Sequence, residues 1–356
     1  MTRGEFISGG SALAASALFG GTGGKGDGLI WADLIHLGVD MWIDHPTETV
    51  DPVKFTLQRK GPSDTLQCDS AEWRALTDRL GAVGANMVVI DLAEGLRYPS
   101  HPELAVKGSW TPEQMRAEIE RLRKLGLEAI PKINFSTSHD SWMKNYGRMV
   151  STRKYYEFCS DIIRDVADIF RGARFFHIGM DEEAALNQKT YEHCVVRQGD
   201  LWWHDLRFYA DEVAKRGFRP WMWSDYAWNN PKEFYSRCPK DIVQSNWYYS
   251  ASFDMDVLKA NRDKEIVAQE VVQMHEIDQV ECYMKLEQAG FDQIPCGGNW
   301  REDVNLAETV KFCRRHISSK RLLGFLVAPW RRTLPEFHEA NMRGVELLGA
   351  EIAKSI

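Results

Sequence analysis

The sequence predicts a single (β/α)8 barrel, an α/β fold in which eight parallel strands alternate with helices. Two observations favour this fold class: one theme of helix, glycine and short apolar strand recurs along the chain, and the helices are amphipathic. Helices between strands provide the crossover connections that parallel pairing requires. A doubly wound open sheet is the alternative, but no candidate strand is followed by a GxGxxG or P-loop motif.

Helices are marked by their ends and by apolar spacing. Several are expected to end at a glycine just before a strand, since glycine readily adopts the left-handed conformation of helix C-termini. These glycines are Gly84, Gly126, Gly217 and Gly290. One helix is expected to begin after Thr111, which forms a capping box with Gln114. Apolar spacing predicts further helices over residues 155–170, 202–214 and 304–317.

The candidate strands are short apolar runs between these helices. They cover residues 34–40, 86–91, 127–134, 174–179, 218–225, 241–247, 291–296 and 324–330. In a barrel, the carboxyl ends of the strands carry the binding and catalytic side chains. Acids and aromatic residues gather at these ends here. The site candidates among them are Asp40, Asp91, Trp223, Asp225, Trp247, Tyr248, Trp300 and Trp330.

Composition excludes several functional classes. The chain has 356 residues, 44% of them hydrophobic and 27% charged, which is typical of a globular protein. The net charge of −7 argues against a nucleic-acid partner, and no apolar run is long enough for a membrane span. The 13 tryptophans suit a sugar pocket, because flat apolar rings stack on sugar rings. No cofactor motif is present, so none is predicted.

The first residues differ from the rest of the chain. Residues 1–28 hold Arg3, then Phe6-Ile7, a weakly apolar stretch and a glycine-rich linker. This order resembles a twin-arginine export signal in which the second arginine has become Gly4. We therefore expect an exported protein, periplasmic or extracellular, whose barrel domain covers residues 29–356. A disordered tail is the alternative.

The sharpest motif is the run of acids after the fourth candidate strand, His177-Ile-Gly-Met-Asp181-Glu182-Glu183. Three adjacent carboxylates repel one another, so at least one pKa is expected to rise. A carboxylic acid that stays protonated near neutral pH is what general acid catalysis needs. A helix N-terminus, which also favours acids, is the alternative. A metal site is not predicted, because no second histidine lies at ligand spacing from His177.

Residues 177–182 resemble the His-x-Gly-Gly-Asp-Glu signature of glycoside hydrolase family 20, the β-N-acetylhexosaminidases. The surroundings are similar in the same order. Residues 98–104 resemble a family loop, residues 110–139 resemble the third βα unit, and tryptophans stand at the ends of strands five, six and eight. The resemblance covers residues 34–350.

The resemblance implies an enzyme that removes terminal β-linked N-acetylhexosamine from a glycan by substrate-assisted retention. It implies that Glu182 is the acid/base and that Asp181 orients the substrate's acetamido group. The residues implied to bind substrate are His139 and His177 in the polar network, Trp223, Trp247 and Trp330 around the acetamido methyl, and Tyr248 as hydroxyl donor. A carbohydrate is the expected partner, and a homodimer is compatible with the family.

Several positions depart from the family pattern. Asp40 is followed by Met41 rather than the usual arginine, Pro-Glu-x-Asp has become Pro131-Lys132-Ile133-Asn134, and Trp-x-Glu has become Trp330-Arg331-Arg332. An arginine in place of an acid can bind a carboxylate or sulfate, so Arg332 suggests an anionic amino sugar. Two alternatives remain open: a barrel that binds amino sugars without cleaving them, and a glycosidase of different sugar specificity.

Overall fold

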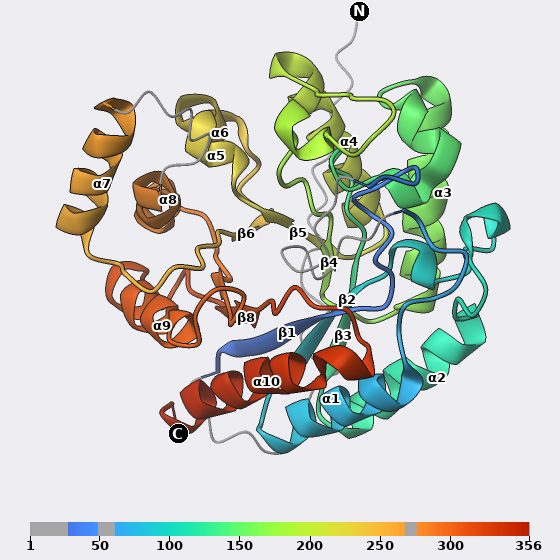
Figure 1. Cartoon of the computed structure of the whole chain (residues 1–356), viewed down its shortest axis with the longest axis horizontal. Helices are drawn as coiled ribbons and strands as arrows, with labels where there is room; N and C mark the ends of the chain where they lie inside the picture. The colour runs from blue at the N-terminus through green and yellow to red at the C-terminus, as the bar shows by residue number, and fades with distance from the viewer. Residues whose placement is uncertain (1–27, 49–60, 268–275, 356) are drawn as a thin grey trace, which may run out of the picture.

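A computed structural model describes residues 28–48, 61–267 and 276–355, and it confirms the predicted (β/α)8 barrel (Figure 1). All eight strands are parallel and follow the order β6-β5-β4-β3-β2-β1-β8-β7. Bridges from Gln244 to Gln293 and from Trp247 to Cys296 join the two outer strands and close the ring, which excludes the open sheet. The predicted export segment lies outside the described residues, except for Gly28.

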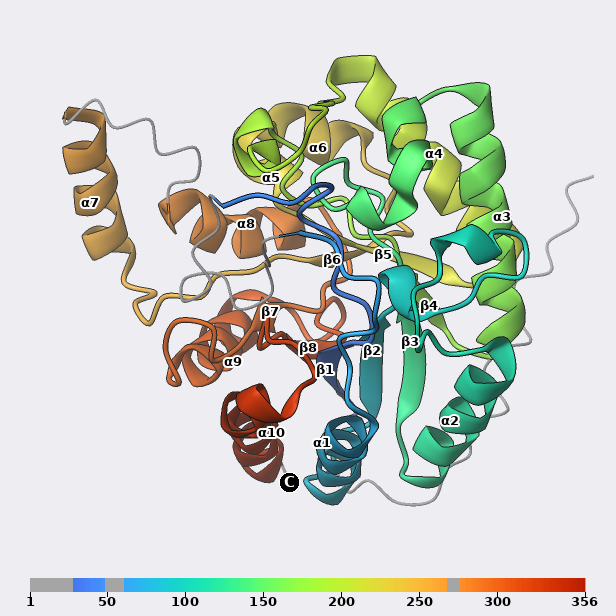
Figure 2. The same ribbon diagram turned by 45° about the vertical axis from the view of Figure 1, so that its right-hand side comes forward.

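The strands are β1 (Ile30–His36), β2 (Met87–Asp91), β3 (Glu128–Lys132), β4 (Phe175–His177), β5 (Arg219–Trp223), β6 (Val243–Ser245), β7 (Cys296–Gly297) and β8 (Gly324–Val327). The α-helices are α1 (Ser70–Ala82), α2 (Pro112–Lys124), α3 (Arg153–Ile169), α4 (Gly199–Lys215), α5 (Tyr226–Asn229), α6 (Pro231–Arg237), α7 (Met255–Val267), α8 (Glu276–Gln288), α9 (Asn305–His316) and α10 (His338–Ala353). Helices α1 and α10 pack side by side in both views (Figures 1 and 2). The first and the last α-helix of the barrel are therefore neighbours. Among the described residues, no helix combines the length and apolar character needed to cross a membrane.

The predicted helix ends are confirmed. Thr111 and Gln114 form both hydrogen bonds of the capping box at the start of α2. The four glycines that precede β2, β3, β5 and β7 all have a positive φ, between +80° and +88°. Each glycine ends its helix in a left-handed backbone conformation that would be strained for a residue with a side chain. The chain then turns into the next strand of the barrel.

Alternation along the strands divides the core into two layers. Leu34, Val89 and Ile130 belong to a cluster inside the barrel, whereas their neighbours Ile35 and Val88 pack in the outer cluster, between strands and helices. Because side chains alternate along each strand, every second residue still faces inward at the carboxyl end of the strand. The site is built on those ends.

The predicted bounds of the first strand are wrong. β1 begins at Ile30 rather than Leu34 and ends at His36 rather than Asp40. The strand ends because Leu37 and Gly38 turn to donate backbone hydrogen bonds to the carbonyl of Asp91. A Cβ at Gly38 would lie 2.4 Å from a neighbouring backbone oxygen, so the tight turn requires glycine. The inward residue at this strand end is therefore His36.

Candidate active site

The loop after β4 carries the acidic run and bends sharply. Its backbone is left-handed at Gly179, Met180 and Glu182, with φ of +70°, +80° and +57°. A Cβ at Gly179 would lie 2.1 Å from the Oδ1 of Asn134, so only glycine fits there. Such a conformation costs a non-glycine residue about 1–3 kcal/mol. The bend lets Asp181 and Glu182, which alternation would separate, approach the same histidine.

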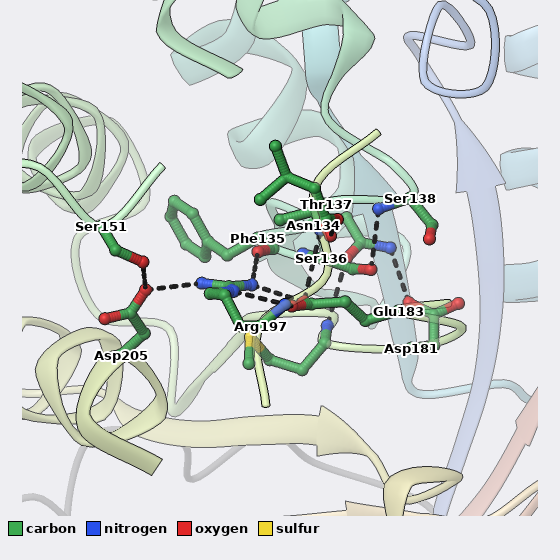
Figure 3. A network of polar contacts seen from close by, with 12 residues as sticks. Asn134, Phe135, Ser136, Thr137, Ser138, Ser151, Asp181, Glu183, Arg197 and Asp205 are labelled. Atoms are coloured by element: carbon green, nitrogen blue, oxygen red, sulfur yellow. Dashed lines mark hydrogen bonds and ion pairs between the residues drawn. The ribbon is translucent and has the colours of Figure 1, made fainter. Parts of the chain in front are cut away.

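Asn134 holds Asp181 in one orientation (Figure 3). The Nδ2 of Asn134 donates to the Oδ1 of Asp181 at 2.7 Å. The Oδ1 of Asn134 accepts from the backbone N–H groups of Met180 and Ser136, at 3.1 and 3.0 Å. Because two backbone donors point at one side of the amide, the other side must be the NH2 group. Asn134 is therefore a fixed donor to the Asp181 carboxylate.

His139 faces both carboxylates of the pair. Its Nε2 lies 3.8 Å from the Oδ2 of Asp181 and 3.6 Å from the Oε2 of Glu182. Burial lowers the pKa of His139, so the neutral ring does not cancel the charge of the pair near pH 7. The three side chains each offer one ligand atom, all within 4.8 Å of one another. A bound cation is thus a competing explanation for the cluster, and chelation would test it.

Glu182 has the properties of a general acid. Burial and the Asp181 carboxylate raise the pKa of Glu182 to about 8, which confirms that one acid of the run has a raised pKa. Its side chain remains 31% exposed, so a substrate can reach it. The backbone N–H of Glu182 donates to the Oδ2 of Asp225 at 2.8 Å. Asp225 therefore supports the pair rather than capping α5, to which its side chain gives no hydrogen bond.

The third acid of the run belongs to a different network (Figure 3). Both oxygens of Glu183 accept from Arg197, at 2.8 and 2.6 Å, and Arg197 also contacts Asp205 at 2.9 Å. The guanidinium donates to the carbonyl of Phe135 at 2.7 Å as well. Arg197 thus ties the loops after β3 and β4 to α4, and it neutralises Glu183. No sequence motif marked Arg197, because its partners Glu183, Asp205 and Phe135 lie 14, 8 and 62 residues away at no recognisable spacing.

A buried ion cluster lies at the carboxyl ends of β1, β2 and β3. The sheet register places Asp91 opposite Lys132, and the Lys132 Nζ lies 2.5 Å from the Asp91 Oδ2. The Nδ1 of His36 is 3.3 Å from the same oxygen. Burial opposes the ionisation of Asp91, but Lys132 and His36 outweigh it and lower its pKa to about 2. Asp91, a predicted site residue, thus belongs to a buried ion cluster with Lys132 and His36 at the bottom of the candidate site.

Aromatic side chains form the opposite wall. The ring of Trp223 lies 4.6 Å from that of His177 and 5.9 Å from that of Trp330. The Nε1 of Trp330 donates to the hydroxyl of Tyr249 at 2.7 Å, and the Tyr249 ring stacks on Trp247 at 5.6 Å. The structure therefore brings the three predicted tryptophans together, with Tyr249 as the link between two of them.

Comparison with known proteins identifies the family. The family described as "Glycosyl hydrolase family 20, catalytic domain" matches residues 85–336. The chain belongs to this family. A comparison with the curated proteins found no match.

Solved structures of family 20 proteins share the fold. A β-N-acetylhexosaminidase from Bacteroides fragilis NCTC 9343 is 12% identical at a TM-score of 0.54, over 89% of this chain and 65% of that one. The family 20 β-N-acetylhexosaminidase of Streptomyces coelicolor A3(2) is 14% identical at 0.56, over 90% and 64%. The chitobiase of Flavobacterium johnsoniae is 15% identical at 0.53, over 87% and 48%. The chain thus spans between about half and two thirds of the length of these proteins.

One predicted pocket residue of this family 20 chain lies elsewhere. Tyr248 packs against Phe253 in the outer layer, and its hydroxyl donates to the carbonyl of Ser252 at 2.9 Å. The prediction failed because neighbouring residues of an extended segment face opposite sides. Trp247 faces inward, so Tyr249 does too, and Tyr248 cannot. The spacing of two residues from Trp247 was the signal for Tyr249.

Asp40 lies beside the pocket rather than at the end of a strand. Its carboxylate accepts from the backbone of Ser63 at 2.8 Å, and its own N–H donates to Glu94 at 3.0 Å. Burial and the Asp40 carboxylate raise the pKa of Glu94 to about 8. Asp40, Glu94 and Asp140 line a cavity of about 260 Å³. The rings of Trp42 and His139 make an edge-to-face contact with 5.6 Å between their centres, which connects this loop to the histidine that faces Asp181 and Glu182.

Arg332 is turned toward the protein. Its guanidinium lies 3.4 Å from the amide oxygen of Gln67 and 3.7 Å from Glu336, over the ring of Phe337. These contacts do not support the predicted role of Arg332 in binding an anionic group. The neighbouring Arg331 instead packs over Trp300, with 4.6 Å from its guanidinium carbon to the ring centre.

Proposed function

We propose that this family 20 chain is a glycosidase that removes terminal β-linked N-acetylhexosamine by substrate-assisted catalysis with retention of configuration. One observation carries the proposal: two adjacent carboxyl groups lie in different surroundings. Asp181 accepts a hydrogen bond from the fixed amide of Asn134, whereas burial and the Asp181 carboxylate raise the pKa of Glu182 to about 8, as a general acid requires. A protein that only binds sugars has no need for such a pair.

The first step transfers the proton of Glu182 to the oxygen of the leaving group. The acetamido oxygen of the substrate attacks C1 as the bond from C1 to the leaving oxygen breaks, which forms an oxazolinium ring. The carboxylate of Asp181 accepts from the acetamido N–H and offsets the positive charge that develops. In the second step the Glu182 carboxylate takes a proton from water and the water oxygen attacks C1. The bond from C1 to the ring oxygen of the oxazolinium breaks and restores the acetamido group, and the two inversions give net retention.

The aromatic wall suits the acetamido group of such a substrate. Trp330, which is partly exposed, offers apolar surface for its methyl group, and the fully buried Trp223 packs behind it. The Tyr249 oxygen already accepts from Trp330, so its own proton is available to another acceptor. The Sγ of Cys296, at 3.5 Å, is a weak acceptor, and the acetamido oxygen of a substrate would be a better one. Tyr249 thus takes the role that the sequence assigned to Tyr248.

Hydrolysis of aryl N-acetyl-β-glucosaminides and galactosaminides tests the proposal. We expect turnover, inhibition by a thiazoline that mimics the oxazoline, and insensitivity to EDTA. Turnover that resists the thiazoline would point to a glycosidase of different sugar specificity. Binding without turnover would point to a lectin-like barrel, and loss of activity with EDTA would favour a metal at His139, Asp181 and Glu182.

We also propose that the protein is exported, on the basis of its first 28 residues alone. Expression of the full chain in a bacterium with twin-arginine export, followed by fractionation, tests this. Retention in the cytoplasm would contradict it.

A further inference from the structure

Among the residues that the structure describes, Arg331 differs from the other enclosed arginines in having no acidic partner. It is half-buried, and its Nη1 donates to the carbonyls of Pro329 and Trp330, at 2.6 and 3.4 Å. Burial lowers the pKa of Arg331, and no described carboxylate raises it. Arg197, by contrast, is paired with both Glu183 and Asp205.

An unpaired, partly desolvated guanidinium is costly, so its retention needs an explanation. The two carbonyl contacts use one nitrogen, Nη1, and leave Nε and Nη2 without a hydrogen bond among the described residues. The ring of Trp300 supports the flat face of the guanidinium at 4.6 Å. The stack holds the group in one place, which favours two-pronged binding of an oxyanion.

The stack of Arg331 on Trp300 lies at the rim of the candidate site. Trp300 and Trp330 both pack against the cluster inside the barrel. Trp330, the residue before Arg331, also contacts the rings of Trp223 and His36. The Asp181 carboxylate in the site and the negative net charge of the chain would repel an anionic substrate. A cation at the rim offsets that repulsion.

We propose that Arg331, supported by Trp300, is a subsite for an oxyanion, the sulfate or carboxylate group of an anionic amino-sugar substrate. The inference rests on the proposed glycosidase function and adds the substrate class to it. It gives Arg331 the role in binding an anionic group that the sequence analysis predicted for Arg332.

Matched substrates test the subsite. The kcat/KM is measured for aryl N-acetyl-β-glucosaminide and its 6-sulfate, for aryl N-acetyl-β-galactosaminide and its 4-sulfate, and for N-acetylglucosamine linked to glucose or to glucuronic acid. At least one anionic member should be preferred over its neutral partner. Sulfated and uronate pairs distinguish the two sources of the anion. The preference should fall as salt rises, since the charges are partly exposed.

Substitutions at two neighbouring arginines separate recognition of the anion from packing of the side chain. Arg331→Gln should lower kcat/KM for the preferred anionic substrate by about 10- to 100-fold, the usual effect of losing charge-assisted hydrogen bonds, with little change for the neutral partner. Arg332→Gln removes the same charge one residue later and should leave the ratio unchanged. Arg331→Lys, which keeps the charge without the planar fork, should restore only part of the preference.

Three results would overturn the subsite: no anionic preference in any pair, equal loss on neutral and anionic substrates in Arg331→Gln, or loss of the ratio in Arg332→Gln. If Arg331→Gln fails to fold, binding to the wild-type protein tests the subsite instead. Calorimetry measures its affinity for N-acetylglucosamine 6-sulfate, N-acetylgalactosamine 4-sulfate and the glucuronic acid disaccharide. At least one of these ligands must bind more tightly than its neutral partner. Absence of hydrolysis on every substrate, with this preference in binding intact, would refute the proposed activity and not the subsite.

Discussion

The two sides of the barrel mouth use opposite means to prepare the same site. The loops after β3 and β4, with the ends of β1 to β3, present charged and amide groups in close pairs, such as Lys132 with Asp91 and Asn134 with Asp181. The side formed by β5 to β8 presents aromatic rings, among them Trp223 and Trp330. The polar side fixes where charge sits, and the aromatic side supplies the apolar surface that a substrate needs.

The difference explains how two adjacent acids can do different tasks. Asp181 accepts a hydrogen bond from Asn134, whereas the carboxyl group of Glu182 has no hydrogen bond among the described residues and lies 3.6 Å from the Nε2 of His139. Enclosure therefore acts mainly on Glu182 and raises its pKa. Loss of a group on the polar side should change proton transfer and stability, and loss on the aromatic side should change substrate binding.

The largest effect is expected at Glu182. Glu182→Gln should lower kcat by about 100- to 10,000-fold on a disaccharide, because the leaving oxygen loses its proton donor. Aryl substrates with good leaving groups should lose least. Kinetics on a series of leaving groups measures this, and near-normal turnover of the disaccharide would refute the role of Glu182 as acid.

The buried ion cluster should dominate stability. Lys132→Met leaves Asp91 charged and buried without its main partner, so the free energy of unfolding should fall by about 3–5 kcal/mol. The exposed Lys124 at the end of α2 is the matched control, and Lys124→Met should change it by less than about 0.5 kcal/mol. Urea unfolding compares the two. Equal effects would show that the cluster does not stabilise the barrel.

Asn134→Asp tests the fixed amide on the polar side. The new carboxylate cannot donate to Asp181 while ionised, so kcat should fall by about tenfold or more near neutral pH. At lower pH the new acid gains a proton and can donate again, so part of the activity should return. The added negative charge should also move the alkaline limb of the pH profile upward. A uniform loss at all pH values would indicate a purely structural role.

Tyr249→Phe and Tyr248→Phe compare the inward and outward tyrosines. Removing the Tyr249 hydroxyl takes a partner from Trp330 and a donor from the pocket, so kcat/KM should fall by about tenfold. Tyr248→Phe removes a hydroxyl that donates to the Ser252 carbonyl in the outer layer, and it should change kcat/KM by no more than about twofold. A larger loss of kcat/KM in Tyr248→Phe than in Tyr249→Phe would show that Tyr248 is the hydroxyl donor of the pocket.

The pH dependence of the unmodified protein gives the mildest test. The proposed mechanism requires the acid form of Glu182, and burial and the Asp181 carboxylate raise the pKa of Glu182 to about 8. The kcat/KM should therefore be level below that pH and fall as pH rises through it, by up to about tenfold per unit. A limb that begins near pH 5 would show that Glu182 is not held in its acid form.

Much of the fold could be predicted because its signals are local. A helix end at Gly126, a capping box at Thr111 and a strand of alternating pattern each involve a few neighbouring residues. The order of motifs around Asp181 and Glu182 then indicated the family, and the structure brought His139, Trp223 and Trp330 to the same barrel mouth. Strand ends were less predictable, since β1 stops where Gly38 meets the loop after β2.

By itself, the sequence determined the barrel, the acidic pair and the tryptophans of the wall. The tertiary structure alone decided that Tyr249 rather than Tyr248 faces inward, that Glu183 belongs to Arg197, and that Arg331 rather than Arg332 is without an acidic partner among the described residues. For the tyrosines, a shift of one residue reverses the direction of a side chain in extended backbone. For the other two, the backbone is left-handed at Glu182 and Trp330, so alternation does not apply and contacts with distant segments decide where each side chain points.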